Sequence, residues 1–562
     1  MAKIIYICSR KPLSPEIESK LNVICSKLSP DNITPKEPLI YVSNDSAYAV
    51  LNPTVNFLKN NSSILLGQLF GDEADWYVPE AEYPDGSYAL FRDGDDLCEI
   101  ISDAAASRTI WYYHDENILI ASTSQRAIIL YLRSFEFNEN VIPWMLSTGS
   151  LGPGLSWDKR IKCIPPGSSV LLNKIFWTFE HRTNSLKFKT EIRSDFEHED
   201  LLMEVLKNIF ISLKADLSNW SLPLSGGYDS RGILLFLLSS GKKIKNTVTW
   251  ALNSSQNKNS SEASIAKELS DKYSIENIFY PTDTVTEESL EVLFERFLQN
   301  GEGRIDYFSG FAEGFKIWKN IFEQGTEGIF SGDECFGGSD ISSALTLRRT
   351  LGFCLCSDFS NLKDAVKFGI PEQISPENFR QINNESLDQW RDRLFREFRL
   401  PVILSAVTDL KLSYIEQISP LLSHKILKLL SGLPDHLRKD KFLFRKIISS
   451  LSPYVRFKTD DSDSVPRDIY NDPELIMIIK KELNTSEAHK IFAEDFLSFV
   501  INGINSAPSA KSLSFSTLKK LIPRSVKNFL RDKASLPDLD PNVLAFRVYI
   551  LVKMNNILLN DS

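Results

Sequence analysis

The sequence lacks the cysteine and histidine patterns that mark disulfide-rich proteins and zinc proteins. Its 562 residues include only seven cysteines, scattered and odd in number, so no disulfide framework is predicted. The one close pair, Cys354 and Cys356, has no second pair or nearby histidine to complete a zinc site. The six histidines are dispersed without the spacing of metal ligands. We therefore predict buried free thiols, and histidines in core or surface roles.

Positive charge and long apolar runs are also scarce. The formal net charge is −9, which argues against a nucleic-acid partner held mainly by phosphate contacts. No apolar stretch approaches the ~18 residues that a membrane span requires. The short apolar run near the amino end predicts a first strand and not a signal sequence. We expect a cytoplasmic protein with no nucleic-acid partner and no membrane partner.

What the sequence does have is an ordinary globular composition, with 43% hydrophobic and 24% charged residues. A chain of this length is too long for one hydrophobic core, and two domains are predicted, 1–198 and 199–562. In the first, short β-branched and aromatic runs alternate with turn signals, which indicates mainly antiparallel sheet. Its predicted strands include 64–66, 87–92, 97–101, 109–113, 117–122 and 169–172.

The second domain begins with helical periodicity near Glu199. A strand at 221–224 then leads through a glycine-rich loop into an apolar helix, and strands at 246–251 and 278–280 follow with a helix at 261–273 between them. Alternating strands and helices imply a parallel sheet with both faces covered. From about residue 340 the pattern is helical almost throughout. The predicted fold class is α/β.

The most informative segment lies where the strand at 221–224 meets its helix: Leu224-Ser225-Gly226-Gly227-Tyr228-Asp229-Ser230. Paired glycines let backbone N–H groups approach an anion closely, and the following helix N-terminus adds unpaired donors and partial positive charge. Serine hydroxyls donate further hydrogen bonds, and Asp229 can hold Mg²⁺ against phosphates. The alternative is a plain glycine turn capped by Asp or Ser. The complete pattern in this context favours a phosphate-binding loop.

This loop resembles the pyrophosphate-binding loop of the ATP pyrophosphatase superfamily, and a second segment narrows the resemblance. Ser331-Gly-Asp-Glu-Cys-Phe-Gly-Gly338 follows an apolar strand at 328–330 and is similar to the SGxGxDELFGG segment of the asparagine synthetase family. The resemblance implies that ATP and Mg²⁺ bind here, with Ser331 and Gly332 against the adenosine and Asp333 joining Asp229 on the metal.

The second segment departs from the family pattern, because it is shorter between Ser-Gly and Asp-Glu. Alignment on Asp-Glu-x-Phe-Gly-Gly keeps Asp333 in register as the metal ligand and leaves Ser331 and Gly332 out of register. The alternative for the whole segment is an acidic turn that ends in Gly-Gly.

Two further resemblances lie downstream. Glu416-Gln-Ile-Ser-Pro-Leu-Leu422 resembles the family's E-V-R-S-P-F-L-D helix entry, and Tyr454-Val-Arg-Phe-Lys458 is similar to its R-x-K segment. The resemblance makes Lys458 an electrostatic catalyst of adenylation and amide formation, and Glu416 a substrate-orienting or proton-accepting group. The alternatives are a solvated surface lysine and an ordinary helix or ion-pair carboxylate.

The first domain resembles the glutaminase domain of the same family, an Ntn-type α+β sandwich. Arg108-Thr-Ile-Trp-Tyr-Tyr113 and Ala121-Ser122-Thr-Ser-Gln-Arg126 echo its strands. In that domain the nucleophile is a cysteine directly after the initiator methionine, whereas position 2 here is Ala2. Cys8 lies inside the predicted strand and does not supply both the thiol and the terminal amine. Glutamine hydrolysis is therefore not expected.

These resemblances imply an ATP-dependent enzyme that activates a carboxylate as its adenylate and joins it to an amine. The favoured branch is the lasso peptide cyclases, which link an Asp or Glu side chain of a precursor peptide to its N-terminal amine. That branch implies a precursor peptide as partner, with a leader-peptide-processing protease or a recognition protein. The alternatives are an ammonia-using asparagine synthetase, a β-lactam synthetase-like ligase, and a non-enzymatic ATP-binding scaffold in a peptide maturation complex.

Overall fold

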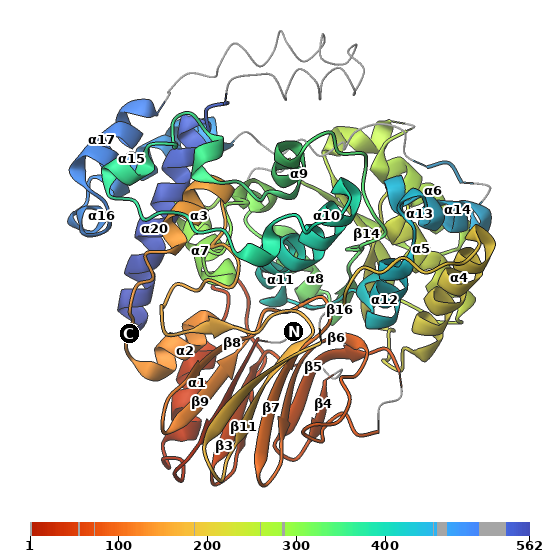
Figure 1. Cartoon of the computed structure of the whole chain (residues 1–562), viewed down its shortest axis with the longest axis horizontal. Coiled ribbons are helices and arrows are strands. Elements are labelled where there is room, and N and C mark those ends of the chain that lie inside the picture. The colour runs from red at the N-terminus through yellow and green to blue at the C-terminus, as the bar shows by residue number, and fades with distance from the viewer. Residues whose placement is uncertain are drawn as a thin grey trace.

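The structure is a computed structural model that describes residues 3–53, 57–71, 74–184, 186–258, 260–283, 287–452, 455–457, 469–504 and 536–562. Figure 1 shows two regions, a layered β-sandwich formed by the amino-terminal part and a larger region of helices around a parallel sheet. All seven cysteines are free, as predicted; three are buried and four are partly buried.

The amino-terminal region contains two antiparallel sheets of six strands each. The first has the order β10-β8-β9-β1-β3-β2 and the second β12-β11-β7-β6-β5-β4. The strands are β1 (Lys3–Ser9), β2 (Leu39–Val42), β3 (Ser46–Leu51), β4 (Leu58–Asn60), β5 (Ser63–Leu69), β6 (Gly86–Asp93), β7 (Leu97–Ser102), β8 (Trp111–His114), β9 (Ile118–Ser122), β10 (Lys162–Cys163), β11 (Ser168–Asn173) and β12 (Thr178–Thr183).

Alternation of side chains along β1 explains why the two sheets pack face to face. Successive residues of a strand point to opposite faces, so Ile4 and Tyr6 join the core between the sheets while Ile5 and Ile7 face the helices. The helices on that outer face are α1 (Ile17–Leu28), α2 (Gln125–Leu132) and α3 (Val141–Thr148). This layered sandwich is the arrangement predicted for the first domain.

The second region is built on a five-stranded sheet in which every neighbouring pair is parallel. Its order is β15-β14-β13-β16-β17. The strands are β13 (Trp220–Pro223), β14 (Asn246–Ala251), β15 (Asn277–Pro281), β16 (Gly328–Phe330) and β17 (Glu416–Ile418). The predicted α/β class, with a parallel sheet after the sandwich, is confirmed. The expected helix entry at Glu416 is wrong, because Glu416–Ile418 pairs with β16 as the edge strand.

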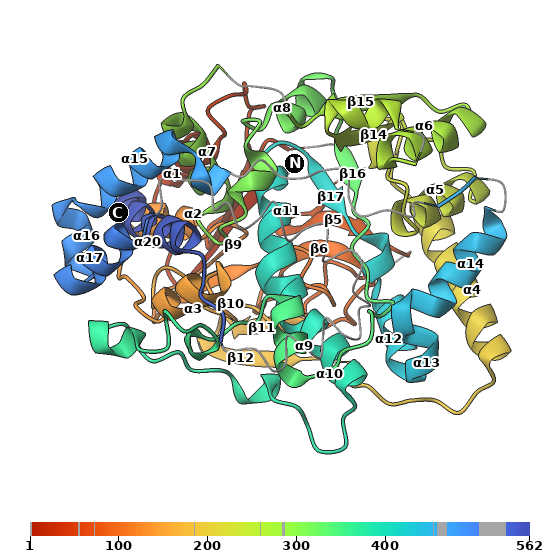
Figure 2. The same ribbon diagram turned by 90° about the horizontal axis from the view of Figure 1, so that it is seen from above.

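Helices surround this sheet and fill most of the carboxyl-terminal half (Figure 2). They are α4 (Asp195–Ser212), α5 (Asp229–Ser239), α6 (Glu262–Lys272), α7 (Leu290–Gly301), α8 (Lys316–Glu323), α9 (Ala344–Leu351), α10 (Leu387–Leu394), the π-helix η6 (Phe395–Leu404), α11 (Ser405–Leu412), α12 (His424–Gly432), α13 (Asp435–Arg438), α14 (Phe442–Leu451), α15 (Pro473–Leu483), α16 (Ser486–Ile491), α17 (Glu494–Gly503) and α20 (Pro541–Asp561). Residues 352–386 hold only short 3-10 turns, so the expectation of nearly continuous helix fails there.

The predicted domain boundary at 198 falls inside α4. The apolar residues Leu202, Leu206 and Ile209 of this helix belong to the core under α5 and α14. The last helix, α20, returns to the sandwich and packs on α2 and α3 (Figure 1). Among the described residues α20 is the one helix long and apolar enough to span a bilayer, which the sequence interpretation missed, and 72% of its apolar window is buried inside the protein.

Candidate functional site

The two sequence motifs lie at the carboxyl edge of the parallel sheet. After β13 the chain adds β14 and β15 on one side, then returns to add β16 and β17 on the other. Ligands of such sheets bind where the strand order reverses, outside the carboxyl ends. The loops after β13 and β16 both leave the sheet at this point. They are in contact, since a Cβ added to Gly332 would lie 3.5 Å from Cβ of Asp229.

The loop between β13 and α5 is ordered by its own serines. The backbone N–H of Ser225 donates to Oγ of Ser230 at 3.1 Å, and the N–H of Gly227 donates to Oγ of Ser225 at 3.3 Å. Upstream, the N–H of Leu224 donates to the carbonyl of Val248 at 2.8 Å, which joins the loop to β14. The serines therefore fix the turn at the start of α5, where the helix N-terminus and its partial positive charge favour an anion.

The acidic residues of both motifs meet one cation, Lys441, which sequence reasoning did not identify. Its Nζ lies 2.8 Å from Oδ2 of Asp229 and 2.8 Å from Oε1 of Glu334. The neighbouring Asp333 accepts a hydrogen bond at 2.8 Å from the hydroxyl of Ser331. The side chains of Asp229 and Lys441 are 29% and 28% exposed, so the cluster is open to a ligand.

Gly337 explains how Lys441 reaches the motifs. A Cβ at Gly337 would lie 2.1 Å from the carbonyl oxygen of Arg438, and its φ of +112° is one that other residues rarely adopt. The N–H of Asp440 donates to the carbonyl of Gly338 at 2.9 Å. The Gly-Gly pair thus lets residues 438–441 approach the second motif. The Gly-Gly pair can be recognised in the sequence. No sequence pattern, however, points to residues 438–441, the segment about 100 residues downstream that the pair contacts.

The charges in this cluster shift one another. Burial raises the pKa of Glu334 to about 7, with the ammonium of Lys441 acting against that rise and the carboxylate of Asp229 adding to it. Burial acts to lower the pKa of Lys441, but the carboxylates of Glu334 and Asp229 outweigh it and raise that pKa above its ordinary value. Lys441 therefore stays protonated near neutral pH, while Glu334 can change its charge there.

The donor set fits a magnesium ion that is shared with phosphates. No cluster of three or more Asp, Glu, His or Cys residues suited to a metal occurs in the part of the chain that the structure describes. Mg²⁺ commonly takes only one or two protein carboxylates and completes its shell with water and phosphate oxygens. Asp229 and Asp333 stand on two loops that are in contact and supply two such carboxylates.

The chain that leads to Lys458 packs against the first loop, although Lys458 itself lies outside the described residues. Phe457 stacks on Tyr228 with 4.0 Å between ring centroids. The guanidinium of Arg231 donates to the carbonyls of Val455 and Arg456, each at 2.6 Å. Tyr228 and Arg231 therefore hold residues 455–457 beside the loop, a role that the sequence did not suggest.

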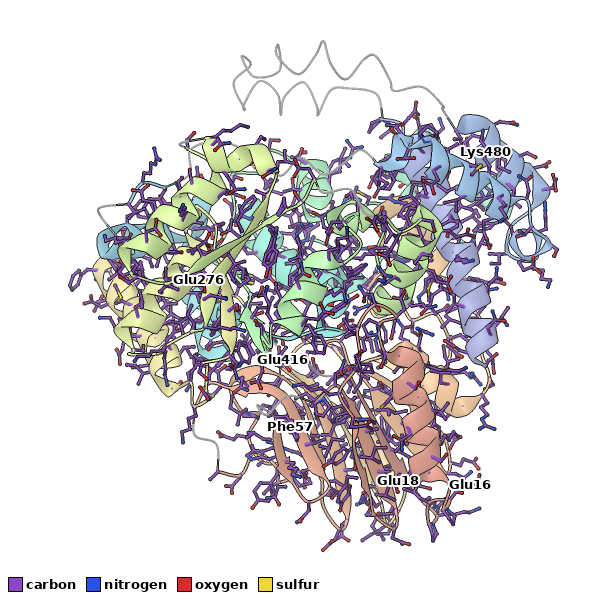
Figure 3. The ribbon with its side chains drawn as sticks, turned by 180° about the vertical axis from the view of Figure 1, so that it is seen from behind. Glu16, Glu18, Phe57, Glu276, Glu416 and Lys480 are labelled. Carbon is purple, nitrogen blue, oxygen red and sulfur yellow. The ribbon has the colours of Figure 1, made fainter. Side chains whose placement is uncertain are left out.

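The structure does not bring Glu416 to this edge. Glu416 pairs with Gly328 at the opposite, amino-terminal end of β16, and only 2% of it is exposed. Its carboxylate forms an ion pair with Arg108 of the sandwich and accepts the N–H of Gln417 at 2.8 Å. Figure 3 shows Glu416 at the junction with the sandwich. The predicted role in substrate orientation or proton transfer does not fit this place, and the ion-pair alternative does.

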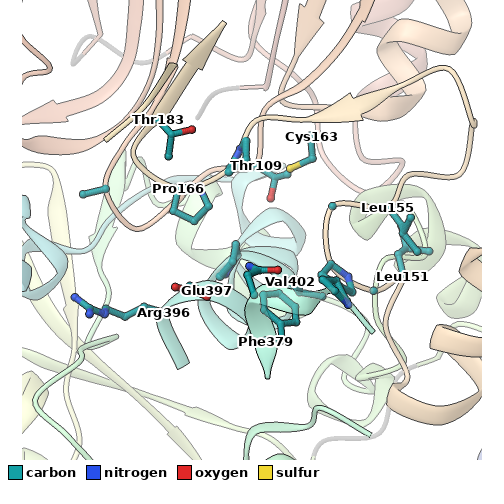
Figure 4. Close-up of a pocket in the computed structure, with 18 of the residues that line it drawn as sticks. Thr109, Leu151, Leu155, Cys163, Pro166, Thr183, Phe379, Arg396, Glu397 and Val402 are labelled. Carbon is teal, nitrogen blue, oxygen red and sulfur yellow. The ribbon is translucent and has the colours of Figure 1, made fainter. Parts of the chain in front are cut away.

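Another cavity is remote from the motifs. It encloses about 500 Å³ between the sandwich and the helical region and contains no residue of either motif (Figure 4). Proline, aromatic and aliphatic side chains form most of its wall, together with Thr109, Arg304, Arg396 and Glu397. A second cavity of about 210 Å³ does touch the second motif, at Glu334, Cys335, Gly337 and Gly338.

Comparisons with known proteins leave the family open. No known family and no curated protein matches the sequence. Among the solved structures that match, two align with 52% of the chain at TM-scores of 0.20 and 0.21, which are too low to support a conclusion about function. One is a glutamine phosphoribosylpyrophosphate amidotransferase from B. subtilis complexed with ADP and GMP, 9% identical over 70% of its length. The other is described as the allosteric regulatory enzyme of purine biosynthesis, 10% identical over 69% of its length.

Proposed function

We propose that the protein is an ATP-dependent amide ligase that activates a carboxylate as its adenylate. The observation that carries the proposal is the meeting of the two motifs at the carboxyl edge of the parallel sheet, where the strand order reverses. There Asp229, Asp333 and Lys441 surround the end of a glycine loop at the start of α5. Two carboxylates, a cation and a helix N-terminus together match the charges of a metal-bound triphosphate.

In this proposal each group acts by position and charge. A substrate carboxylate oxygen attacks the α-phosphorus of ATP, the bond to the pyrophosphate oxygen breaks, and the loop amides with Ser225 and Ser230 hold the departing pyrophosphate. Mg²⁺, held by Asp229 and Asp333, would neutralise the phosphate charge. An amine nitrogen then attacks the acyl carbon, AMP leaves with the carbon–oxygen electron pair, and the amine proton passes to solvent.

Lys441 is assigned a second role here, because its Nζ already spans Asp229 and Glu334. When phosphates bring their own negative charge and a metal ion, the lysine can turn from Asp229 toward a phosphate oxygen. Lysine suits this exchange, since its ammonium is a compact point charge on a flexible stem. Lys458 is proposed as a further cation beside the same phosphates, on the resemblance of its segment.

The proposed substrate is a precursor peptide, closed into a ring between an Asp or Glu side chain and its N-terminal amine. The support is the resemblance of the motifs to the asparagine synthetase family, together with a first domain from which glutamine hydrolysis is not expected. A leader-processing protease or a recognition protein would supply that peptide. The competing proposals are a small-molecule amide ligase and an ATP-binding scaffold. For the location we propose the cytoplasm, with no nucleic-acid partner and no membrane partner.

Pyrophosphate release by purified protein with ATP and Mg²⁺ tests the activity. We expect release that depends on a peptide with an internal Asp or Glu, a product lighter by one water, and a loss of at least ~100-fold for Asp229→Ala. Asp271→Ala changes an exposed aspartate of α6 and is the matched control. Turnover of free aspartate with ammonia would favour the synthetase alternative. ATP binding in a thermal-shift assay without turnover of any substrate would favour the scaffold.

A further inference from the structure

The smaller cavity adjoins the second motif. Its wall combines the motif residues Glu334, Cys335, Gly337 and Gly338 with residues of α9, α10 and η6. At about 210 Å³ it is smaller than the ~300–1,000 Å³ of an ordinary small-molecule site. Its size therefore suits one side chain of a larger substrate.

Arg391 in this wall has a donor without an acceptor. Its Nε donates to Oδ1 of Asp392 at 2.8 Å, and its Nη1 donates to the carbonyl of Ser339 at 2.7 Å and to Asp388 at 2.6 Å. The remaining nitrogen, Nη2, is buried and has no hydrogen-bond partner among the residues that the structure describes. Only 4% of Arg391 is exposed. A buried cationic donor of this kind is costly unless something accepts its hydrogen bond.

Arg399 brings a second guanidinium to the same cavity. It stands on η6 and donates to the carbonyl of Leu351 at 3.1 Å, which engages one of its three nitrogens. Burial lowers the pKa of Arg399, and the carboxylate of Asp333 acts against that change. The cavity therefore extends from Glu334, the neighbour of the proposed metal ligand Asp333, to Arg391, and two arginines line it.

We propose that this cavity binds the acidic side chain that the enzyme activates, with Arg399 as its first contact and Arg391 as its second. The proposal rests on the amide ligase function above and names where its carboxylate substrate sits. Arginine pairs with carboxylates through two parallel hydrogen bonds, which makes it the residue suited to choose an acid over an amide. Nη2 of Arg391 is shielded from water, so a small turn of its guanidinium completes the pair.

Binding of two blocked amino acids tests the site without ATP turnover. N-acetyl-L-aspartate methylamide carries only the side-chain carboxylate, and N-acetyl-L-asparagine methylamide is its neutral match. We expect ligand-observed NMR titration to show at least tenfold tighter binding of the acid by the wild type. Arg399→Gln and Arg391→Lys should each lose that preference. Arg380→Gln, which changes an exposed arginine, should keep it.

Thermal unfolding with and without MgATP accompanies each titration and separates this site from the nucleotide site. The proposal expects the MgATP shift to be the same in wild type and Arg399→Gln. Equal binding of the two probes by the wild type, no binding of either, or an unchanged preference in Arg399→Gln would overturn it. So would a lost MgATP shift in Arg399→Gln, because the cavity would then serve the nucleotide. An acid preference without pyrophosphate release would instead support the site and contradict the ligase function.

Discussion

Buried ion pairs at the junction with the sandwich contrast with the charge cluster at the carboxyl edge of the parallel sheet. At the junction, Arg108 pairs with Glu416 and Arg304 with Asp409, and all four side chains are at most 6% exposed. At the edge, Lys441 joins Asp229 and Glu334 with 12–29% of each side chain exposed. The junction pairs are sealed from ligands, whereas the edge cluster can exchange partners with one. Burial, more than residue type, separates a carboxylate sealed in an ion pair from one that is open to a ligand.

Glu416→Ala should give the largest effect and affect stability alone. It leaves the guanidinium of Arg108 buried without its carboxylate, and breaking a buried pair costs about 3–5 kcal/mol of unfolding free energy. Urea denaturation measures that loss, and pyrophosphate release per folded molecule should be unchanged. Glu372→Ala, at an exposed glutamate, is the control. Unchanged stability with lost activity would restore the catalytic role predicted from the sequence.

Lys441→Met should have the opposite outcome and reduce activity alone. Removing this cation should slow pyrophosphate release roughly 10²–10³-fold, the usual cost of losing one electrostatic stabiliser. Unfolding free energy should change by less than about 1 kcal/mol, because the pair is partly exposed. Lys439→Met is the matched control. Lys439 lies on the same segment as Lys441, pairs with Asp340 and is 47% exposed. Equal rates for the two variants would remove Lys441 from the site.

Gly337→Ala should reduce both the stability and the activity of the protein. Its Cβ would collide with the carbonyl of Arg438 and would have to adopt a φ of +112°, so we expect a loss of about 1–3 kcal/mol of unfolding free energy. Activity should fall with it, because residues 438–441 must move. Gly369→Ala separates the causes, since Gly369 also has a positive φ but nothing within 4 Å of the added Cβ. Equal losses of stability and activity would show that φ alone matters.

The smallest effect concerns pH. The pKa of Glu334 is about 7 in the folded protein and 4.5 without the fold, so the folded state holds a proton that the unfolded state releases. Stability from this group is therefore complete below pH 4.5 and is lost as pH rises through about 7. We expect wild type to lose on the order of 1–3 kcal/mol relative to Glu334→Gln across that window. Parallel curves of unfolding free energy against pH would contradict the shift.

Sequence patterns alone predicted the local elements well. The strand at 246–251 and the strand at 328–330 agree with β14 and β16, and 221–224 differs from β13 by one residue at each end. The glycine loop was placed correctly between a strand and a helix. These features depend on neighbouring residues, because side-chain periodicity and turn chemistry act over a few positions along the chain.

The tertiary structure alone decided which distant residues meet. Asp229 and Lys441 are 212 positions apart, and their contact depends on the strand order and on the close approach at Gly337. Glu416 begins a segment that resembles a motif of the asparagine synthetase family. Strand pairing nevertheless puts Glu416 at the amino-terminal end of β16, beside Arg108. Helix was predicted for this part of the chain, but the packing of α20 on α2, α3 and α15 is decided only on folding, because those elements are distant in the sequence. Local order is written in adjacent residues, whereas the charge environment of a site is set by long-range packing.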